Sequence, residues 1–393
     1  MTGETKDAPI KVLALTRYGR LAASSRYRLL QFLPMLDQAG FEVTVKELLG
    51  DWYVRSLVDG RRPSGGRVVA AYLRRIITLL RAETPDLIWI ERELLPWLPS
   101  TFERVLLAGE TPTILDLDDS VFHRYDQHSS TLVRKFLGDR VDRAMAAATV
   151  VVSGNPTITA RARASGAARV VELPTVIDCA RYPMAPTKLS RGEPFTIGWM
   201  GSPQNSHYLE ALRQPLSQLA AEGPVRILVI GGAPETLSGL PVEVRSWSET
   251  SEIEALCEMD AGVMPLPDRP FERGKCGLKL LQYMAAWKPA VASPVGVNAQ
   301  LIDHGTRGFL ADSPDEWLAA LRRLRDDAAL CQSMGLAGRM LIEQHYSVDS
   351  VGPQLVALMR ELTSAKPREA LSLLSAQPGG RRVAPSGSPS PRR

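Results

Sequence analysis

Short apolar runs alternate with helical periodicity from the start of the chain. Residues 10–16, IKVLALT, form a continuous apolar run with the length of a buried parallel strand. After a polar loop, four leucines recur at helical spacing within 27–38, and Gly40 ends this predicted helix. Residues 41–48, FEVTVKEL, predict the next strand. This order of strand, loop, helix and strand is typical of a doubly wound α/β domain.

The same rhythm continues through two halves of the chain. Residues 183–194 contain three prolines, a glycine and little apolar material, which predicts an interdomain linker. Helices are predicted over 67–81, 130–147, 209–221, 252–259, 278–286, 314–325 and 351–362. Strands are predicted over 86–91, 111–119, 148–155, 169–178, 195–201, 225–232, 242–247, 261–267, 289–294 and 308–312. Two consecutive units of this kind predict two Rossmann-like, parallel-sheet domains that face each other across a cleft.

The composition adds limits on function. The 393 residues carry a formal net charge of +4 and show no nucleic-acid-binding module, so no nucleic-acid partner is expected. The four cysteines lie far apart, without metal-site spacing, and indicate a reducing, cytoplasmic location. No run reaches the roughly 18 apolar residues that a membrane span needs. The segment 67–81 carries three arginines seven residues apart, which suits either an anionic membrane surface or solvent.

The segment 265–298 contains the most informative group of residues. A glycine-bearing basic loop precedes a predicted helix at the carboxyl edge of a sheet, where α/β proteins bind ligands. Helix N-termini attract phosphate because their N–H groups are unpaired and their dipole is positive. The alternative is a solvated basic loop before an ordinary helix. We favour a diphosphate site formed by Arg273, Lys275, Gly277, Leu278 and Lys279, with Gly296 approaching from the next loop.

Several separated motifs resemble one enzyme family. The stretch GKCGLKLLQYMAA with the following AVASPVGVN is similar to the donor-binding signature of the family 4 glycosyltransferases, a retaining, GT-B-fold, glycogen-synthase-like group. FTIGWMGSPQNSHYL resembles the start of that family's second domain, VVVSGN and LPTVID resemble the last strands of its first domain, and RYGRLAASSRYRLLQFLP resembles its N-terminal loop and helix. The resemblance spans roughly residues 10–362.

This resemblance implies a glycosyltransferase that needs no cofactor or metal. The donor is expected to be a nucleotide-sugar, UDP- or GDP-linked, held by the second domain, and the acceptor a sugar, glycan or lipid-linked molecule held by the first. Two glutamates that many members carry in the donor signature correspond here to Gly274 and Gln282, and Glu272 is a candidate substitute. Gln282 could hydrogen-bond a ribose hydroxyl. Since the usual early Arg–Lys pair is missing after Gly201 and Ser202, the cations of the basic loop are its candidate replacements.

Three acids at a predicted strand end form a second candidate group. In LDLDDSVFH, Asp116 and Asp118 are expected on one side of a strand and Asp119 at its exit. Asp118 and Asp119 stand nearest to a His–Asp pair of the family and are assigned, with Lys279, as catalytic residues. His123 is a candidate assistant. The alternative is that these acids only cap a helix, and metal binding is not expected.

The loop after the first strand is assigned to the acceptor side. Its backbone N–H groups and hydroxyls at Gly19, Ser24, Ser25 and Arg26 are suited to a phosphate or a sugar. Either serine could instead cap the following helix.

These observations predict a GT-B protein with an acceptor domain at 10–185, a donor domain at 190–345, a helix at 350–364 that returns to the first domain, and a disordered basic tail at 370–393. The predicted activity is retaining sugar transfer in cell-surface polysaccharide or glycolipid synthesis, in the cytoplasm or at the inner face of the membrane. Two alternatives stay open: a nucleotide-sugar-binding scaffold without catalysis, favoured by Gly274, and a nucleotide-sugar epimerase on the same fold.

Overall fold

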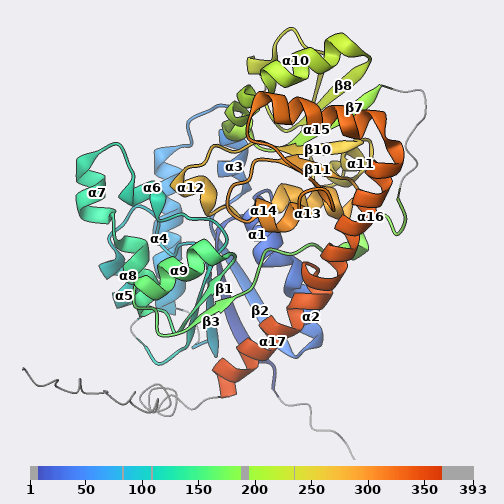
Figure 1. Cartoon of the computed structure of the whole chain (residues 1–393). Coiled ribbons are helices and arrows are strands. Elements are labelled where there is room, and N and C mark those ends of the chain that lie inside the picture. The colour runs from blue at the N-terminus through green and yellow to red at the C-terminus, as the bar shows by residue number, and fades with distance from the viewer. Residues whose placement is uncertain (1–7, 82–83, 108, 187–193, 234, 365–393) are drawn as a thin grey trace, which may run out of the picture.

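Two six-stranded sheets form the framework of the protein, each at the centre of its own domain, with the second domain above the first in Figure 1. The computed structural model describes residues 8–81, 84–107, 109–186, 194–233 and 235–364. The predicted tail and most of the predicted linker therefore lie outside the described residues. All strand pairs within the two sheets are parallel. Separate apolar cores cover both faces of each sheet, as expected for doubly wound domains.

The first sheet has the strand order β2-β1-β3-β4-β5-β6. Its strands are β1 (Ile10–Tyr18), β2 (Phe41–Leu49), β3 (Leu87–Glu91), β4 (Thr113–Leu117), β5 (Val150–Ser153) and β6 (Val170–Glu172). Its helices are α1 (Ala23–Arg28), α2 (Leu33–Gln38), α3 (Asp51–Val58), α4 (Gly65–Arg81), α5 (Ser100–Leu106), α6 (His123–Asp126), α7 (Thr131–Leu137), α8 (Arg140–Ala147) and α9 (Pro156–Ala164).

The second sheet has the strand order β12-β11-β10-β7-β8-β9. Its strands are β7 (Phe195–Met200), β8 (Val225–Ile230), β9 (Val242–Arg245), β10 (Ala261–Met264), β11 (Ala290–Ala292) and β12 (Gly308–Leu310). Its helices are α10 (Arg213–Glu222), α11 (Glu252–Cys257), α12 (Pro270–Arg273), α13 (Leu278–Ala285), α14 (Asn298–Ile302), α15 (Pro314–Asp326) and α16 (Ala328–His345).

The last described helix connects the domains a second time. Helix α17 (Val348–Ser364) follows α16 and runs down along the lower domain (Figure 1). Its buried face, from Val348 to Met359, belongs to the same apolar cluster as Val12 and Leu29 of the first domain. An isolated parallel bridge between Ile177 and Ser347 marks the point where the chain crosses back. The first domain therefore contains both ends of the described chain.

Two predicted helices are interrupted in the structure. The helix expected over 27–38 is divided at Leu29, because Pro34 lies in the first turn of α2 and cannot continue a preceding helix. The helix expected over 130–147 is divided at Gly138 into α7 and α8. Helix α16 was not predicted, and β4 and β6 are shorter than the strands expected over 111–119 and 169–178.

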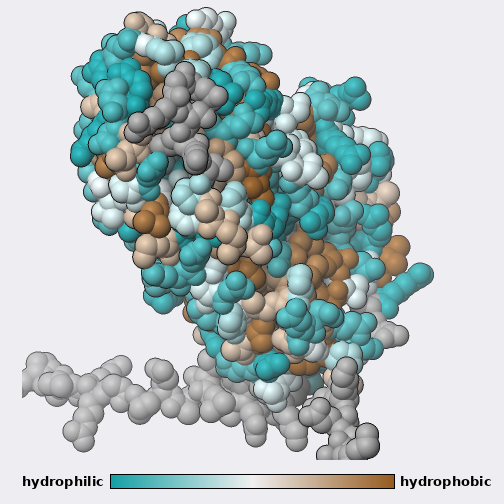
Figure 2. Space-filling model, turned by 90° about the vertical axis from the view of Figure 1, so that its right-hand side faces the viewer, coloured by the Kyte–Doolittle hydropathy of each residue, from teal (hydrophilic) through white to brown (hydrophobic). Residues whose placement is uncertain are grey.

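Surface character differs between the two lobes. In the space-filling view, hydrophobic residues gather on the lower lobe more than at the top of the molecule (Figure 2). Among the helices of the described residues, none combines the length and apolar character needed to cross a bilayer.

Candidate active site

A cavity of about 870 Å³ lies where the carboxyl ends of the two sheets face each other. Its lining includes Tyr18 at the end of β1, Asp118 just after β4, Gly201 just after β7 and Met264 at the end of β10. A smaller cavity, of about 440 Å³, lies within the first domain, where charged lining residues such as Arg140 pair with buried glutamates. The interdomain cavity is therefore the candidate active site, and it is called the cleft below.

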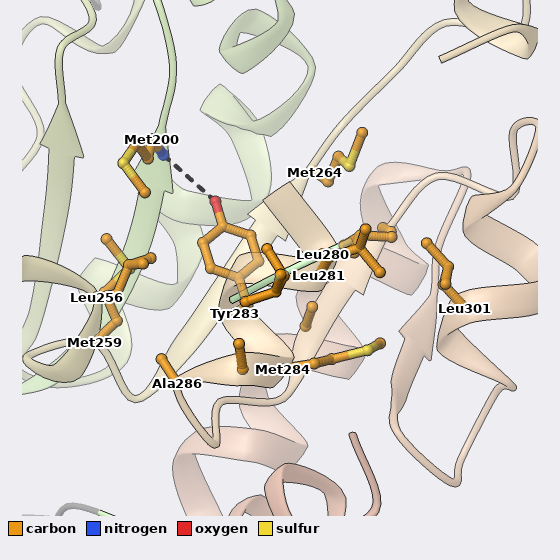
Figure 3. Packing of buried hydrophobic residues seen from close by; sticks show 14 of the residues in the cluster. Met200, Leu256, Met259, Met264, Leu280, Leu281, Tyr283, Met284, Ala286 and Leu301 are labelled. Carbon is orange, nitrogen blue, oxygen red and sulfur yellow. Dashed lines mark hydrogen bonds between the residues drawn. The ribbon is translucent and has the colours of Figure 1, made fainter. Parts of the chain in front are cut away.

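The packing under helix α13 fixes where that helix begins in the cleft. Tyr283 of α13 lies fully buried among methionines and leucines, and its hydroxyl accepts a hydrogen bond from the Met200 N–H at 3.4 Å (Figure 3). Its ring lies against Gly262 of β10, where an added Cβ would come within 2.3 Å of the ring. The helix is thus held closely against the sheet. Gly277 precedes it with a φ of +71°, a left-handed conformation that favours glycine.

Two lysines lie at this helix start and face the cleft. The Lys279 ammonium lies 5.3 Å from the centroid of the Trp199 ring, and the Lys275 ammonium lies 5.0 Å from that of Phe271. Burial, with repulsion from Lys275, lowers the pKa of Lys279 to about 8. Because α13 begins at Leu278, the two lysines do not share a helical face, but the turn still brings both to one wall. This wall can neutralise an anionic ligand.

Asp118 and Asp119 lie on the opposite wall and are clamped by Arg92. The Arg92 guanidinium donates to both Asp118 carboxylate oxygens at 2.7 and 2.9 Å and to Asp119 at 3.1 Å. Burial alone raises the pKa of Asp118, but Arg92 more than compensates and holds it below its ordinary value. Asp118 is therefore ionised at neutral pH. Arg92 adopts a φ of +64°, an uncommon conformation for a residue with a side chain.

The third predicted acid is occupied elsewhere. Asp116 is buried, and its carboxylate accepts hydrogen bonds from Arg28 at 2.6 Å and from the Trp89 indole at 3.2 Å. It does not line the cleft. Asp116 therefore supports the sheet edge, and the carboxylates of Asp118 and Asp119 stay available to a ligand.

A ligand set for a cation is present only in part. Single ligand atoms of Asp118, Asp119 and Cys276 lie within 4.8 Å of one another. Burial, with the nearby charges of Asp119 and Asp118, raises the pKa of the Cys276 thiol to about 12, so it stays protonated at neutral pH. Arg92 already neutralises both aspartates. These residues are poorly suited to a metal ion.

Glu252 is the centre of a buried network between the domains. It is fully buried at the start of α11 and accepts hydrogen bonds from Tyr27 at 3.1 Å and from the Trp247 indole at 2.9 Å. The guanidinium of Arg26 lies 3.5 Å from it and stacks over Trp247. Gln282 donates to the Tyr27 hydroxyl at 3.0 Å. The amide expected to meet a ribose is thus already bonded within the protein.

A second contact joins the domains beside the lysines. Asn155 donates from its amide to the Gly274 carbonyl at 2.9 Å. A Cβ added to Gly274 would lie 1.5 Å from the Ser120 hydroxyl oxygen, so a side chain at this position has no space. The candidate substitute Glu272 accepts a hydrogen bond from Tyr208 at 2.6 Å and does not line the cleft. From this loop, Phe271 and residues 275–279 line the cavity, while residues 272–274 do not.

Most of the predicted site residues meet in the cleft, but five do not. The lining includes Ser24, Arg26, Asp118, Asp119, Gly201, Ser202, Lys275, Gly277, Leu278, Lys279 and Gln282. Arg273 points to solvent and pairs with Asp268, while Gly296 packs against the Arg273 backbone. Gly19 packs against Asp51, and Ser25 donates to the Tyr18 carbonyl. His123 bonds Asp126 at 2.9 Å rather than Asp119, because both lie on the short helix α6. Neither serine caps α1, whose N-cap is Ala22.

Sequence reasoning missed several charged cleft residues. Arg55, Arg92, Arg124 and Glu252 line the cavity but belong to no motif used above. Cys276 lies within the donor signature but was not chosen as a site residue. The only signal was position, since Arg92 directly follows a predicted strand and Glu252 begins a predicted helix.

Comparisons with known proteins agree with this geometry. Residues 194–327 match a family model described as "Glycosyl transferases group 1". No curated protein matches the chain. Among solved structures, it is similar to sucrose-phosphate synthase from Thermosynechococcus elongatus, with 15% identity, 91% of this chain and 100% of that chain covered, and a TM-score of 0.70.

Two further structures share the architecture. HepE from Anabaena in complex with UDP-glucose has 15% identity, 89% and 99% coverage and a TM-score of 0.66. The lipopolysaccharide outer core galactosyltransferase WaaB has 11% identity, 90% and 100% coverage and a TM-score of 0.56. At these identities the similarity shows the fold alone. The chain has the GT-B fold, as the sequence predicted.

Proposed function

We propose that the protein is a retaining glycosyltransferase that moves a sugar from a nucleotide-sugar to an acceptor in polysaccharide or glycolipid synthesis. One observation carries this proposal: a cationic wall with Lys275 and Lys279 faces an acidic wall with Asp118 and Asp119 across a single cleft. The first wall suits the leaving diphosphate, and the second suits hydroxyl groups of the sugars. The family match over the second domain and the earlier resemblance support a nucleotide-sugar donor.

The donor is expected to lie along the second domain. Gly201, Gly231 and Gly232 end adjacent strands there, and Trp247 lines the same wall, so backbone groups and one aromatic ring are available to a nucleotide. UDP is our first candidate because HepE was solved with UDP-glucose and shares this fold. Retention of configuration is proposed from the resemblance to family 4.

A donor panel with product analysis tests this function. UDP-, GDP-, ADP- and TDP-sugars are added to the full-length protein, and the midpoint of thermal unfolding is recorded. We expect one nucleotide class to raise the midpoint. Proton NMR with candidate acceptors then reads the anomeric configuration of the product, and an epimerised donor would show in the same spectrum. A protein that no donor stabilises would refute the proposal.

A scaffold without catalysis is the second candidate. It is favoured by Gly274, which stands where many members of the resembled family carry a glutamate and which packs directly on Ser120. Donor binding without turnover on any acceptor would support this candidate, and turnover would reject it.

The affinity for UDP is expected to depend on pH through Lys279. Its pKa of about 8 means that the ammonium is charged below this value and neutral above it. A diphosphate binds the charged form, so raising the pH from about 7 to about 9 should weaken UDP binding by about tenfold. Calorimetric titration measures this change. Lys279→Gln is the matched control, in which this part of the pH dependence should vanish; an equal dependence in both proteins would contradict the assignment.

Membrane attachment is proposed through helix α4, the light blue helix of the lower domain (Figure 1). One face of α4 packs on the sheet through Ala71 and Arg75. A second apolar row stays exposed at spacings of four, four and three residues, with exposed fractions of 60%, 55%, 46% and 72% for Val69, Leu73, Ile77 and Leu80. Exposed arginines flank this row at positions 61, 62, 67, 74 and 81. An apolar row with cationic flanks is typical of a helix at an anionic lipid surface.

Vesicle binding tests this surface. We expect the protein to sediment with vesicles of phosphatidylglycerol and much less with vesicles of phosphatidylcholine. Leu73→Gln with Ile77→Gln should weaken binding by about 10–100-fold, because two apolar side chains no longer leave water. The matched control replaces two equally exposed residues of α16, Leu336→Gln with Met340→Gln, and should bind as the unmodified protein does. An equal loss of vesicle binding in both double variants would argue against α4 as the membrane-binding surface.

A further inference from the structure

Arg124, on the first-domain wall of the cleft, has no ion-pair partner among the described residues. Arg92 is held by aspartates, Arg26 lies beside Glu252, and Arg17, buried behind the wall, pairs with Glu93. Arg124 of α6 also lines the cleft, yet within the described part of the chain its side chain makes no ion pair or hydrogen bond. A partly buried guanidinium is normally paired, because an unpaired buried charge is costly. Arg124 is therefore available to a ligand.

The surroundings of Arg124 favour an incoming anion. Burial and the like charges of Arg17 and Arg92 lower the pKa of Arg124. The pKa of Tyr53, in turn, is raised by burial and by Tyr18, while Arg17 and Arg124 oppose that shift. Tyr18 and Glu93 only partly offset the shift of the Arg124 pKa. A negative charge bound beside Arg124 would relieve the repulsion between the guanidinium groups.

Hydrogen-bond donors accompany this charge. Tyr18 lines the cleft, and its ring stacks on Tyr53 with centroids 5.8 Å apart. The hydroxyl groups of both tyrosines make no hydrogen bond within the described part of the chain. Arg55 of α3 lines the same side of the cleft and is exposed, again without an ion pair among the described residues. A guanidinium, a phenol and a second guanidinium at the rim match the several oxygens of a phosphate.

We propose that Arg124, Tyr18 and Arg55 form a subsite for a phosphate group on the acceptor. The subsite rests on the proposed function, because it assumes that the first-domain wall receives the acceptor. It is separate from the donor diphosphate, which is assigned to Lys275 and Lys279 on the second-domain wall. The acceptor is thus a phosphorylated sugar or a lipid-linked phosphate, and an acceptor without a phosphate would bind through the hydroxyl contacts of Asp118 and Asp119 alone.

Calorimetric titration of the full-length protein tests the subsite. Glucose 6-phosphate, glucose and a short polyprenyl phosphate in detergent are titrated in the presence of saturating UDP, which occupies the donor wall. We expect both phosphates to bind and glucose to bind much more weakly. The phosphate that binds more tightly shows whether the acceptor is a soluble sugar phosphate or a lipid-linked phosphate. Arg124→Gln should weaken the binding of both phosphates by about 10–100-fold and leave the affinity for UDP unchanged. Arg124→Lys, which keeps the charge, should show a smaller loss.

A control variant and two contrary outcomes complete this test. Arg163→Gln replaces an exposed arginine of α9 that has no partner among the described residues and should bind every ligand as the unmodified protein does. Equal binding of glucose and glucose 6-phosphate would overturn the subsite, as would a loss of UDP affinity in Arg124→Gln, which would assign this arginine to the donor. If UDP does not bind the unmodified protein, this result would instead count against the proposed function. The phosphates can then be titrated in the absence of UDP, and the loss in Arg124→Gln still tests the subsite.

Discussion

Replacing Lys279 by alanine is expected to lower the turnover of sugar transfer by about 10²–10³-fold. Negative charge develops on the diphosphate as the sugar leaves, and the Lys279 ammonium is fixed over Trp199 in a largely buried position. A cation held in such surroundings stabilises the developing charge more than a cation in water does. The measurement is the rate of UDP release at saturating donor, read together with the unfolding midpoint.

Two variants make this result interpretable. Lys135→Ala removes an exposed lysine of α7 and should leave turnover unchanged. Lys275→Ala removes the neighbouring ammonium, which lies over Phe271, and should reduce turnover less. If Lys279→Ala kept its full rate while still folded, the leaving-group role would belong to another residue.

A methyl group at Gly274 is expected to separate the two domains. In Gly274→Ala the added carbon would lie 1.5 Å from the Ser120 hydroxyl oxygen and 2.5 Å from its Cβ. Ser120 is fully buried and the Gly274 carbonyl is bonded to Asn155, so neither side can yield easily. Overpacking of this kind costs about 1–3 kcal/mol. Because the contact lies between domains, we expect a larger radius of gyration in solution scattering and a loss of turnover.

A second substitution should reverse this effect. Ser120→Gly removes both atoms that the methyl group would meet, and the Ser120 hydroxyl is buried without a hydrogen bond among the described residues. The double variant should therefore recover most of the turnover, and Ser120→Gly alone should resemble the unmodified protein. A double variant as open as Gly274→Ala would show that the clash is not the cause. The same geometry explains why restoring a glutamate at position 274 should abolish activity and not improve it.

The regular elements were largely predictable from apolar periodicity, and the exceptions have local causes. Within the run IKVLALT, residues 12–16 are buried on both faces of a parallel sheet, so the pattern alone identified β1. Helix α16 escaped notice because its buried positions include Gly335 and Gly338, which pack closely on Trp287 and Met284 and carry no apolar side chain. Close packing of backbone on side chain leaves no periodic signal in a sequence.

The candidate site was predictable only where residues lie at the ends of strands and helices. Asp118 directly follows β4, Lys279 lies in the first turn of α13, and both line the cleft. Arg92 also follows a strand, but its contacts with two aspartates depend on a left-handed backbone conformation at Arg92. An arginine in the sequence does not indicate such a conformation. Arg124 could not be chosen over other arginines, because its lack of a partner depends on residues distant in the sequence.

The crossing of helix α17 has a consequence for biosynthesis. Five side chains of α17, from Val348 to Met359, complete the apolar core around β1 and β2. Ribosomes make these residues after the whole of the second domain, up to His345, has been synthesised. Since domains generally fold as units while the chain emerges, we infer that the second domain can mature before the first, whose core stays incomplete until α17 has been synthesised.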